Sequence, residues 1–117
     1  MQYMCLIYAP ADGPQLSPEE EQQLFEAYGT FTEAARKSGA MVGGEPLQAP
    51  ETATTVRVRD GKRLVTDGPY AETKEWLGGY YTFECKTLDE ALDWAAKIPG
   101  AKYGSIEVRP IMEIPGM

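Results

Sequence analysis

The first residues constrain the fold most, because they predict a strand that is apolar on both faces. In an extended chain, successive side chains point to opposite faces of a sheet. The two sets are Tyr3, Cys5 and Ile7 on one face and Met4, Leu6 and Tyr8 on the other. A strand with two apolar faces is typical of the middle of a sheet that is covered on both sides. We therefore expect residues 2–8 to form a central strand.

Two amphipathic helices are predicted from capping signals followed by apolar residues at helical spacing. The first begins at the Ser17 cap, with Pro18 in the first helical position and Glu20 completing a capping box, and it ends near Ser38. The second begins at Thr87, with its own capping box, and ends before Pro99-Gly100. Tyr28 and Phe31 in the first helix are expected in the core.

The remaining β-prone runs surround these helices. Asp60-Gly61 between two such runs is the strongest short-range signal of a β-hairpin. The predicted strands are 41–48, 54–59, 62–66, 78–85 and 105–109, with 111–114 as a possible continuation of the last. The order contains two strand–helix–strand halves with a hairpin between them. It predicts an α+β ferredoxin-like sandwich, an antiparallel sheet with two helices on one face, in one domain of residues 1–117.

Two helices cover only one face of such a sheet, so the other apolar face of the first strand would meet water. Exposed apolar area is unfavourable by roughly 25 cal/mol per Å². A second copy of the chain, packed sheet to sheet, removes that cost. We therefore expect a homodimer.

Composition excludes several classes of function. The chain carries 18 acidic and 11 basic residues, a net charge of -7, which argues against nucleic acid as a partner. The one basic cluster, Arg57, Arg59, Lys62 and Arg63, is expected on a solvated hairpin. No run is long enough to span a bilayer and no signal peptide is visible, so we expect a cytoplasmic protein without a membrane partner.

The chain contains no histidine. Histidine-dependent nucleophiles and histidine-ligated metals are therefore excluded, and without a CxxC motif a zinc site is not expected either. Cys5 and Cys85 lie in apolar runs and are expected to be buried thiols. We predict no metal and no cofactor, and any acid–base chemistry must use carboxylates, lysine or tyrosine.

Residues 67–81, DGPYAETKEWLGGYY, predict a site loop that leads into a strand. Asp67 is either turn chemistry with Gly68-Pro69 or a well-placed catalytic base. Glu72, Lys74 and Glu75 form a solvated charge run, or Glu72 and Lys74 are a ligand-binding pair in a cleft. Gly79 suggests the close approach of another backbone or of a ligand. The candidate site is Asp67 as the catalytic residue, with Glu72, Lys74, Gly79 and Tyr81 as ligand contacts.

Two further features leave alternatives open. Trp76 is predicted at a loop tip, as a lid or as an interface anchor. Glu84 on one strand, and Glu107 and Arg109 on the last strand, are expected to form a polar cluster if the two strands are neighbours. The simpler interpretation of that cluster is a structural ion pair.

The chain resembles the YCII-related family, specifically its branch with the DGPF domain. The resemblance rests on six segments: MQYMCLIY, GGEPL, TTVRV, TDGPYAETKEWLGGYY, DEALDWAAKIP and IEVRP. It implies a ferredoxin-like fold that dimerises into an α/β barrel, and a cleft in which the motif aspartate, here Asp67, is catalytic. Tyr70 replaces the phenylalanine of the motif. The histidine that the wider family pairs with its aspartate is absent, so a histidine–aspartate mechanism does not carry over.

Two functions compete. The first is a small enzyme that acts on a small organic molecule by carboxylate acid–base chemistry in a cleft beside the motif loop. The second is a non-catalytic ligand-binding or regulatory dimer. Because members of this branch are similar to proteins encoded beside alternative sigma factors, the second function would act on transcription through a protein partner.

Overall fold

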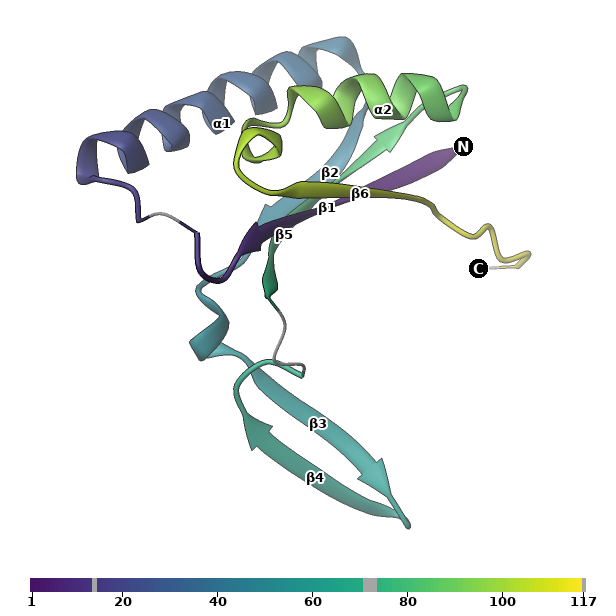
Figure 1. Cartoon of the computed structure of the whole chain (residues 1–117). Helices are drawn as coiled ribbons and strands as arrows, with labels where there is room; N and C mark the ends of the chain where they lie inside the picture. Colours follow the sequence, from purple (N-terminus) through teal and green to yellow (C-terminus); the bar gives the residue numbers. More distant parts are fainter. Residues whose placement is uncertain (14, 71–73, 117) are drawn as a thin grey trace.

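The computed structural model describes residues 1–13, 15–70 and 74–116. This described part of the chain contains six strands, two α-helices and two short 3₁₀ turns (Figure 1). The strands are β1 (Gln2–Pro10), β2 (Met41–Pro46), β3 (Thr54–Arg59), β4 (Lys62–Asp67), β5 (Glu75–Glu84) and β6 (Ser105–Pro110). The helices are α1 (Pro18–Ser38) and α2 (Leu88–Lys97), and the 3₁₀ turns are η1 (Pro50–Thr52) and η2 (Pro99–Lys102).

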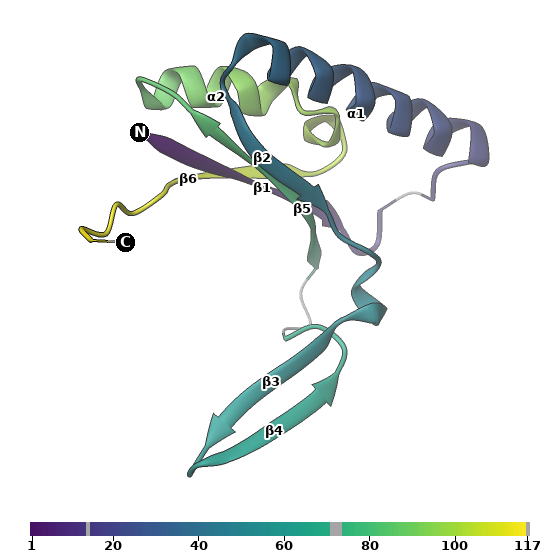
Figure 2. The ribbon, with the colours of Figure 1, turned by 180° about the vertical axis from the view of Figure 1, so that it is seen from behind.

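The main sheet has four strands in the order β2-β5-β1-β6, and every neighbouring pair is antiparallel. Both helices lie against the same face of this sheet, as the two opposite views show (Figures 1 and 2). The order places β1 in the interior of the sheet, as its two apolar faces predict. The α+β ferredoxin-like architecture expected from the sequence is confirmed.

The core lies between the helices and the sheet. Tyr3 and Cys5 of β1 are buried there, together with alternate residues of β5. Aromatic rings fill the space: Phe31 of α1 contacts Tyr81 edge to face at 5.2 Å between centroids, and Phe83 stacks on Trp94 of α2 at 5.4 Å. These geometries are the favoured ones for aromatic pairs.

The ends of the helices follow from their capping residues. The Ser17 hydroxyl accepts a hydrogen bond from the Glu20 amide, and the Glu20 carboxylate accepts one from the Ser17 amide, so the predicted capping box forms. Gly39 ends α1 with φ of +81°, a conformation that glycine adopts without strain. Helix α1 therefore has the bounds predicted from the sequence.

Strand β5 differs from the prediction at its start. It begins at Glu75 rather than Gly78, because β1 continues to Pro10 and pairs with the extra residues. Trp76 lies opposite Ala9 within this pairing and is not at a loop tip. The predicted continuation of the last strand over residues 111–114 is wrong, since these residues form no strand.

Strands β3 and β4 form a sheet of their own, residues 54–67, which we call the arm. Asp60 and Gly61 at its tip have φ of +51° and +73°, as a two-residue hairpin turn requires. In both views the arm projects from the side of the main sheet opposite the helices (Figures 1 and 2). Within the part of the chain that the structure describes, no helix is long and apolar enough to cross a membrane.

Candidate functional site

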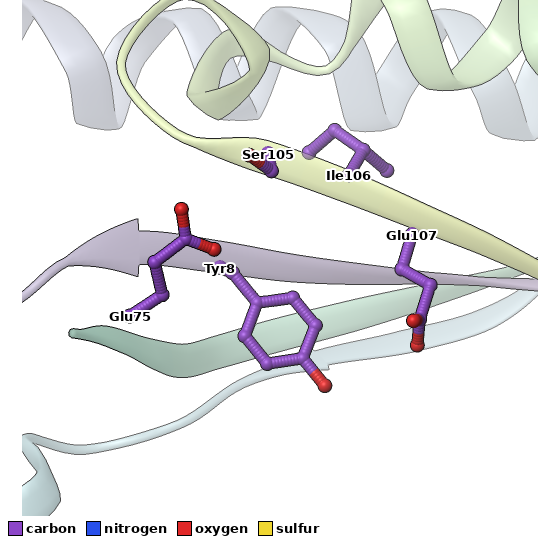
Figure 3. A pocket seen from close by; sticks show the side chains of 5 residues that line it. All are labelled: Tyr8, Glu75, Ser105, Ile106 and Glu107. Atoms are coloured by element: carbon purple, nitrogen blue, oxygen red, sulfur yellow. The ribbon is translucent and has the colours of Figure 1, made fainter. Parts of the chain in front are cut away.

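The face of the main sheet opposite the helices, which we call the open face, contains a hollow at one end. Its volume is about 410 Å³, within the range of small-molecule sites. It is lined by Tyr8, Glu75, Ser105, Ile106 and Glu107 (Figure 3). Figure 3 shows the Tyr8 ring and the Glu107 carboxylate extending from the sheet on the side away from the helices.

The hollow forms where three strands reach the same end of the sheet. Tyr8 lies near the end of β1 and pairs with Ser105 at the start of β6. Glu75 begins β5 and pairs with Pro10. The β1–β5 register shifts between Ile7 and Tyr8, an irregularity of the kind that re-aims side chains beside sites. Glu107 lies two residues after Ser105 on β6, opposite Leu6 of β1, and so is on the open face next to Tyr8.

The charged residues that line the hollow are both carboxylates. Glu107 is exposed and forms no ion pair with any residue that the structure describes. Ionised carboxylates accept hydrogen bonds and protons, and the Tyr8 hydroxyl is able both to donate and to accept. The arrangement is therefore suited to bind hydroxyl groups and to move a proton. Among residues 1–13, 15–70 and 74–116, no group of three histidine, cysteine, aspartate or glutamate residues is arranged to hold a metal ion.

Asp67 does not line this hollow. It is the last residue of β4, is exposed, and lies opposite Thr54. Gly68 follows with φ of +99°, donates its amide to the Ala53 carbonyl at 2.7 Å, and accepts the Thr55 hydroxyl at 2.9 Å. These bonds fix the turn after Asp67 through the amide and carbonyl of Gly68. The catalytic role of Asp67 stays a prediction.

The two charged residues predicted beside Asp67 are Glu72 and Lys74. Glu72 lies outside the described residues. Lys74 is exposed, and its backbone carbonyl accepts a hydrogen bond from the Ala11 amide at 2.7 Å, which ties the start of β5 to the end of β1. Lys74 directly precedes Glu75 of the hollow in the sequence. The structure does not test a Glu72–Lys74 pair.

Gly79 and Tyr81 occupy the packed part of the sheet. A Cβ atom on Gly79 would lie 2.8 Å from the Glu45 carbonyl oxygen of β2, so the close approach predicted there is made by another backbone. The Tyr81 ring is buried in the core, and its hydroxyl lies 2.7 Å from the Thr32 hydroxyl. This packing role of Tyr81 differs from the ligand contact predicted from the sequence.

The predicted cluster of Glu84, Glu107 and Arg109 does not form, because β1 lies between β5 and β6. Glu84 of β5 lies opposite Gln2 of β1, and its carboxylate forms an ion pair with the N-terminal ammonium at 2.6 Å. Glu107 lies two rows further along the sheet, opposite Leu6. Of the three residues, only Glu107 reaches the hollow.

Tyr8 and Glu75 were not recognised from the sequence as site residues. The alternation of residues 2–8 places Tyr8 on an apolar strand face, and Glu75 follows Lys74 in a run of charged residues. The available signal was topological: in the predicted antiparallel order, the end of residues 2–8 meets the starts of the strands at 78–85 and 105–109. Polar residues at these strand ends are therefore candidates for a shared site.

The two cysteines are unsuited to nucleophilic chemistry. Cys5 and Cys85 are both free and buried. Burial disfavours the thiolate and raises the pKa of Cys5 to about 11, and it raises the pKa of Cys85 as well. At neutral pH both thiols stay protonated. Any chemistry at the site must therefore use its carboxylates and the Tyr8 hydroxyl.

Comparison with known proteins agrees with this fold. The sequence matches the YCII-related domain family over residues 1–115. It is 37% identical over 97 residues to the uncharacterized protein R00369 of Rhizobium meliloti (strain 1021), covering 81% of this chain and 78% of that protein. In structure it is similar to the 5-chloro-2-hydroxyhydroquinone dehydrochlorinase TftG of Burkholderia phenoliruptrix AC1100, solved with 2,5-dihydroxybenzoquinone. That match has a TM-score of 0.55 and 14% identity, and covers 96% of this chain and 94% of TftG. The chain belongs to the YCII-related family.

Proposed function

We propose that this protein is a small-molecule enzyme that transfers protons on a hydroxylated organic ring bound in the hollow of the open face. The observation that carries the proposal is that Tyr8, Glu75 and Glu107 line one hollow at the sheet end, with Tyr8 and Glu107 extending to the same side of the sheet (Figure 3). The choice of ligand class follows TftG, a protein of the same fold that was solved with a dihydroxybenzoquinone.

Each lining residue has a distinct part in the proposed reaction. Glu107 takes a proton from a hydroxyl or an activated C–H group of the ligand and becomes a carboxylic acid, leaving an enolate. It then returns the proton to a different atom of the ligand, so the net change is a tautomerisation and no cofactor is consumed. Tyr8 donates its hydroxyl to a ligand oxygen, and Glu75 accepts a ligand hydroxyl at the rim.

Asp67 has a secondary place in this proposal. It lies at the end of the arm strand β4, while the hollow is lined by residues of β1, β5 and β6. Within one copy of the chain, Glu107 is therefore the better candidate for the proton acceptor. The central row of the open face is also apolar, with Met4 and Leu6 half-buried beside Tyr8, and we propose that a second copy covers it and excludes water from the site.

The test uses 2,5-dihydroxybenzoquinone as the probe, because its ring hydrogens exchange with solvent through a tautomer. Binding is measured by calorimetry, and proton transfer by the rate at which the ring C–H signals disappear in D₂O under NMR. Glu107→Gln should slow the catalysed exchange about a hundredfold or more, since an amide does not accept the proton. Tyr8→Phe should weaken binding about fivefold to tenfold by removal of one hydrogen bond.

The control is Glu51→Gln, which removes an exposed carboxylate from η1, outside the hollow. It should leave binding and exchange unchanged. Binding without any accelerated exchange would favour the alternative of a non-catalytic ligand-binding or regulatory dimer. If Glu107→Gln exchanged the probe as fast as Glu51→Gln, the assignment of Glu107 as the base would be rejected.

A further inference from the structure

The arm exposes an apolar surface that no other described part of its own chain covers. Every residue of its two strands except Thr55 is exposed. The cross-strand pairs put Val56, Val58 and Val65 on one face, where they are 60%, 63% and 56% exposed, with Arg63 beside Val58. An isolated two-stranded hairpin is at best marginally stable in water. A partner surface would therefore stabilise the arm.

The arm is also the basic part of an acidic protein. It contains four bases, Arg57, Arg59, Lys62 and Arg63, and two acids, whereas the rest of the chain contains seven bases and sixteen acids. Arg57 lies over the Tyr70 ring at 5.1 Å. Over the described ranges, none of the four bases forms an ion pair with a carboxylate. Their charge is available to a partner.

The open face has the complementary properties. Its central row is apolar, with Met4, Leu6 and Tyr8 half-buried, and Glu107 stands beside that row without an ion pair to any described residue. The arm and the open face lie on the same side of the molecule, opposite the helices (Figures 1 and 2). One copy of the chain thus presents both halves of a complementary contact.

We propose that the arm is an intersubunit clasp: in a twofold dimer, the arm of each copy lies on its partner's open face and places Arg63 beside Glu107 of the hollow. This goes beyond a sheet-to-sheet dimer and rests on the proposed function only in treating the hollow as the site. A twofold interface uses the same patches on both copies, so the contact between Arg63 and Glu107 forms twice. Strands of six residues reach about 20 Å, further than the roughly 10 Å between packed sheets, so the arm is long enough to pass onto the other copy.

The first test is the mass of the protein in solution, by analytical ultracentrifugation over a dilution series. The wild type should sediment as twice its 12.9 kDa chain mass. Val56→Thr/Val65→Thr keeps β-branched side chains of the same shape, so the arm still folds, but it should raise the dimer dissociation constant about tenfold. The control Phe25→Gln changes an exposed apolar residue of α1, on the helix side, and should leave it unchanged.

The second test addresses the charge contact. Arg63→Glu should raise the dissociation constant about fivefold, and Glu107→Lys in the same chain should restore it, because both copies then carry the swapped pair. Arg36→Glu on α1 is the control for a change in net charge alone. A mixture of Arg63→Cys and Glu107→Cys chains should form a mixed disulfide dimer under oxidation, since the native cysteines are buried.

A monomer at every micromolar concentration would overturn the clasp, and so would a dimer that neither arm variant weakens. Failure of the mixed chains to cross-link while the dimer persists would reject the placement of Arg63 beside Glu107. None of these measurements needs a ligand. A dimer that depends on the arm but does not bind the quinone probe would therefore reject the proposed function and keep the clasp, and the opposite outcome would reject the clasp alone.

Discussion

Gly78 and Gly79 are neighbours in β5, yet a methyl group added to each would meet very different surroundings. On Gly79 the new Cβ would lie 2.8 Å from the Glu45 carbonyl oxygen and 3.2 Å from the Pro46 Cα atom. On Gly78 the nearest atom would be the Ile7 carbonyl oxygen, at 3.8 Å, an ordinary contact. We predict that Gly79→Ala destabilises the fold and that Gly78→Ala does not.

The magnitude follows from two opposing effects. A methyl group packed too closely against backbone cannot be relieved by a side-chain rotation, so β2 must move away from β5, which costs about 1–3 kcal/mol. Alanine also restricts the unfolded chain, which stabilises the fold by about 0.4–1 kcal/mol. Gly79→Ala should therefore lose about 1–2 kcal/mol of unfolding free energy. At Gly78 only the second effect operates, so the change should be neutral or slightly stabilising.

The assay is urea unfolding followed by tryptophan fluorescence, with all variants at one protein concentration so that any association acts equally. In thermal unfolding, 1 kcal/mol corresponds to a shift of about 4 °C for a chain of this size. The comparison between adjacent positions removes most effects of composition and location. Equal stability of the two variants, or a lower stability for Gly78→Ala, would refute the packing of β2 on β5 described above.

Three further predictions are independent of this pair. Gly44→Ala should destabilise the protein by a similar amount, because its Cβ would lie 2.7 Å from a carbonyl oxygen of β5, whereas Gly43→Ala meets open space and should be tolerated; thermal unfolding compares them. The pKa of Cys5 is raised by burial from 9.0 to about 11, so the thiol stabilises the fold below pH 9 and this stability is lost as the pH rises to about 11. Urea unfolding across that pH range should show a loss of about 2 kcal/mol that is absent in Cys5→Ala, and equal pH dependence would contradict it. Asp67→Asn should leave the melting temperature nearly unchanged, because the turn is held by backbone bonds of Gly68; a large loss of proton transfer on the quinone probe in this stable variant would restore Asp67 to the active site.

The fold was predictable because its signals are local and agree with one another. The Ser17 capping box and Gly39 fix the length of α1, and Asp60-Gly61 fixes the turn of the arm. The two apolar faces of residues 2–8 then favour an interior position in the sheet for β1. Each of these signals needs only the residue and its near neighbours in sequence, so no long-range information was required.

The candidate site was harder to predict because it is assembled from strand ends. Glu107 was recognised as a polar residue on the last strand, but its proposed neighbour Glu84 is separated from it by β1. From the sequence, Glu75 is one of a run of charged residues. In the structure it pairs with Pro10 and is the first residue of β5. Register decides which side chains share a hollow, and register depends on a bulge at Ile7 and Tyr8 that has no clear sequence signal.

The proposed clasp also bears on the chemistry of the hollow. Two carboxylates in one site repel each other, and once Glu107 has taken the proton the Glu75 carboxylate still repels the enolate. This repulsion grows when a second copy excludes water. A cation beside Glu107 offsets it, and Arg63 of the arm is a basic side chain that no described carboxylate neutralises. On this arrangement the arm supplies the positive charge, while the open face supplies the apolar cover for the three valines. Salt should therefore weaken the dimer and slow the catalysed exchange together, because both depend on the same pair of charges.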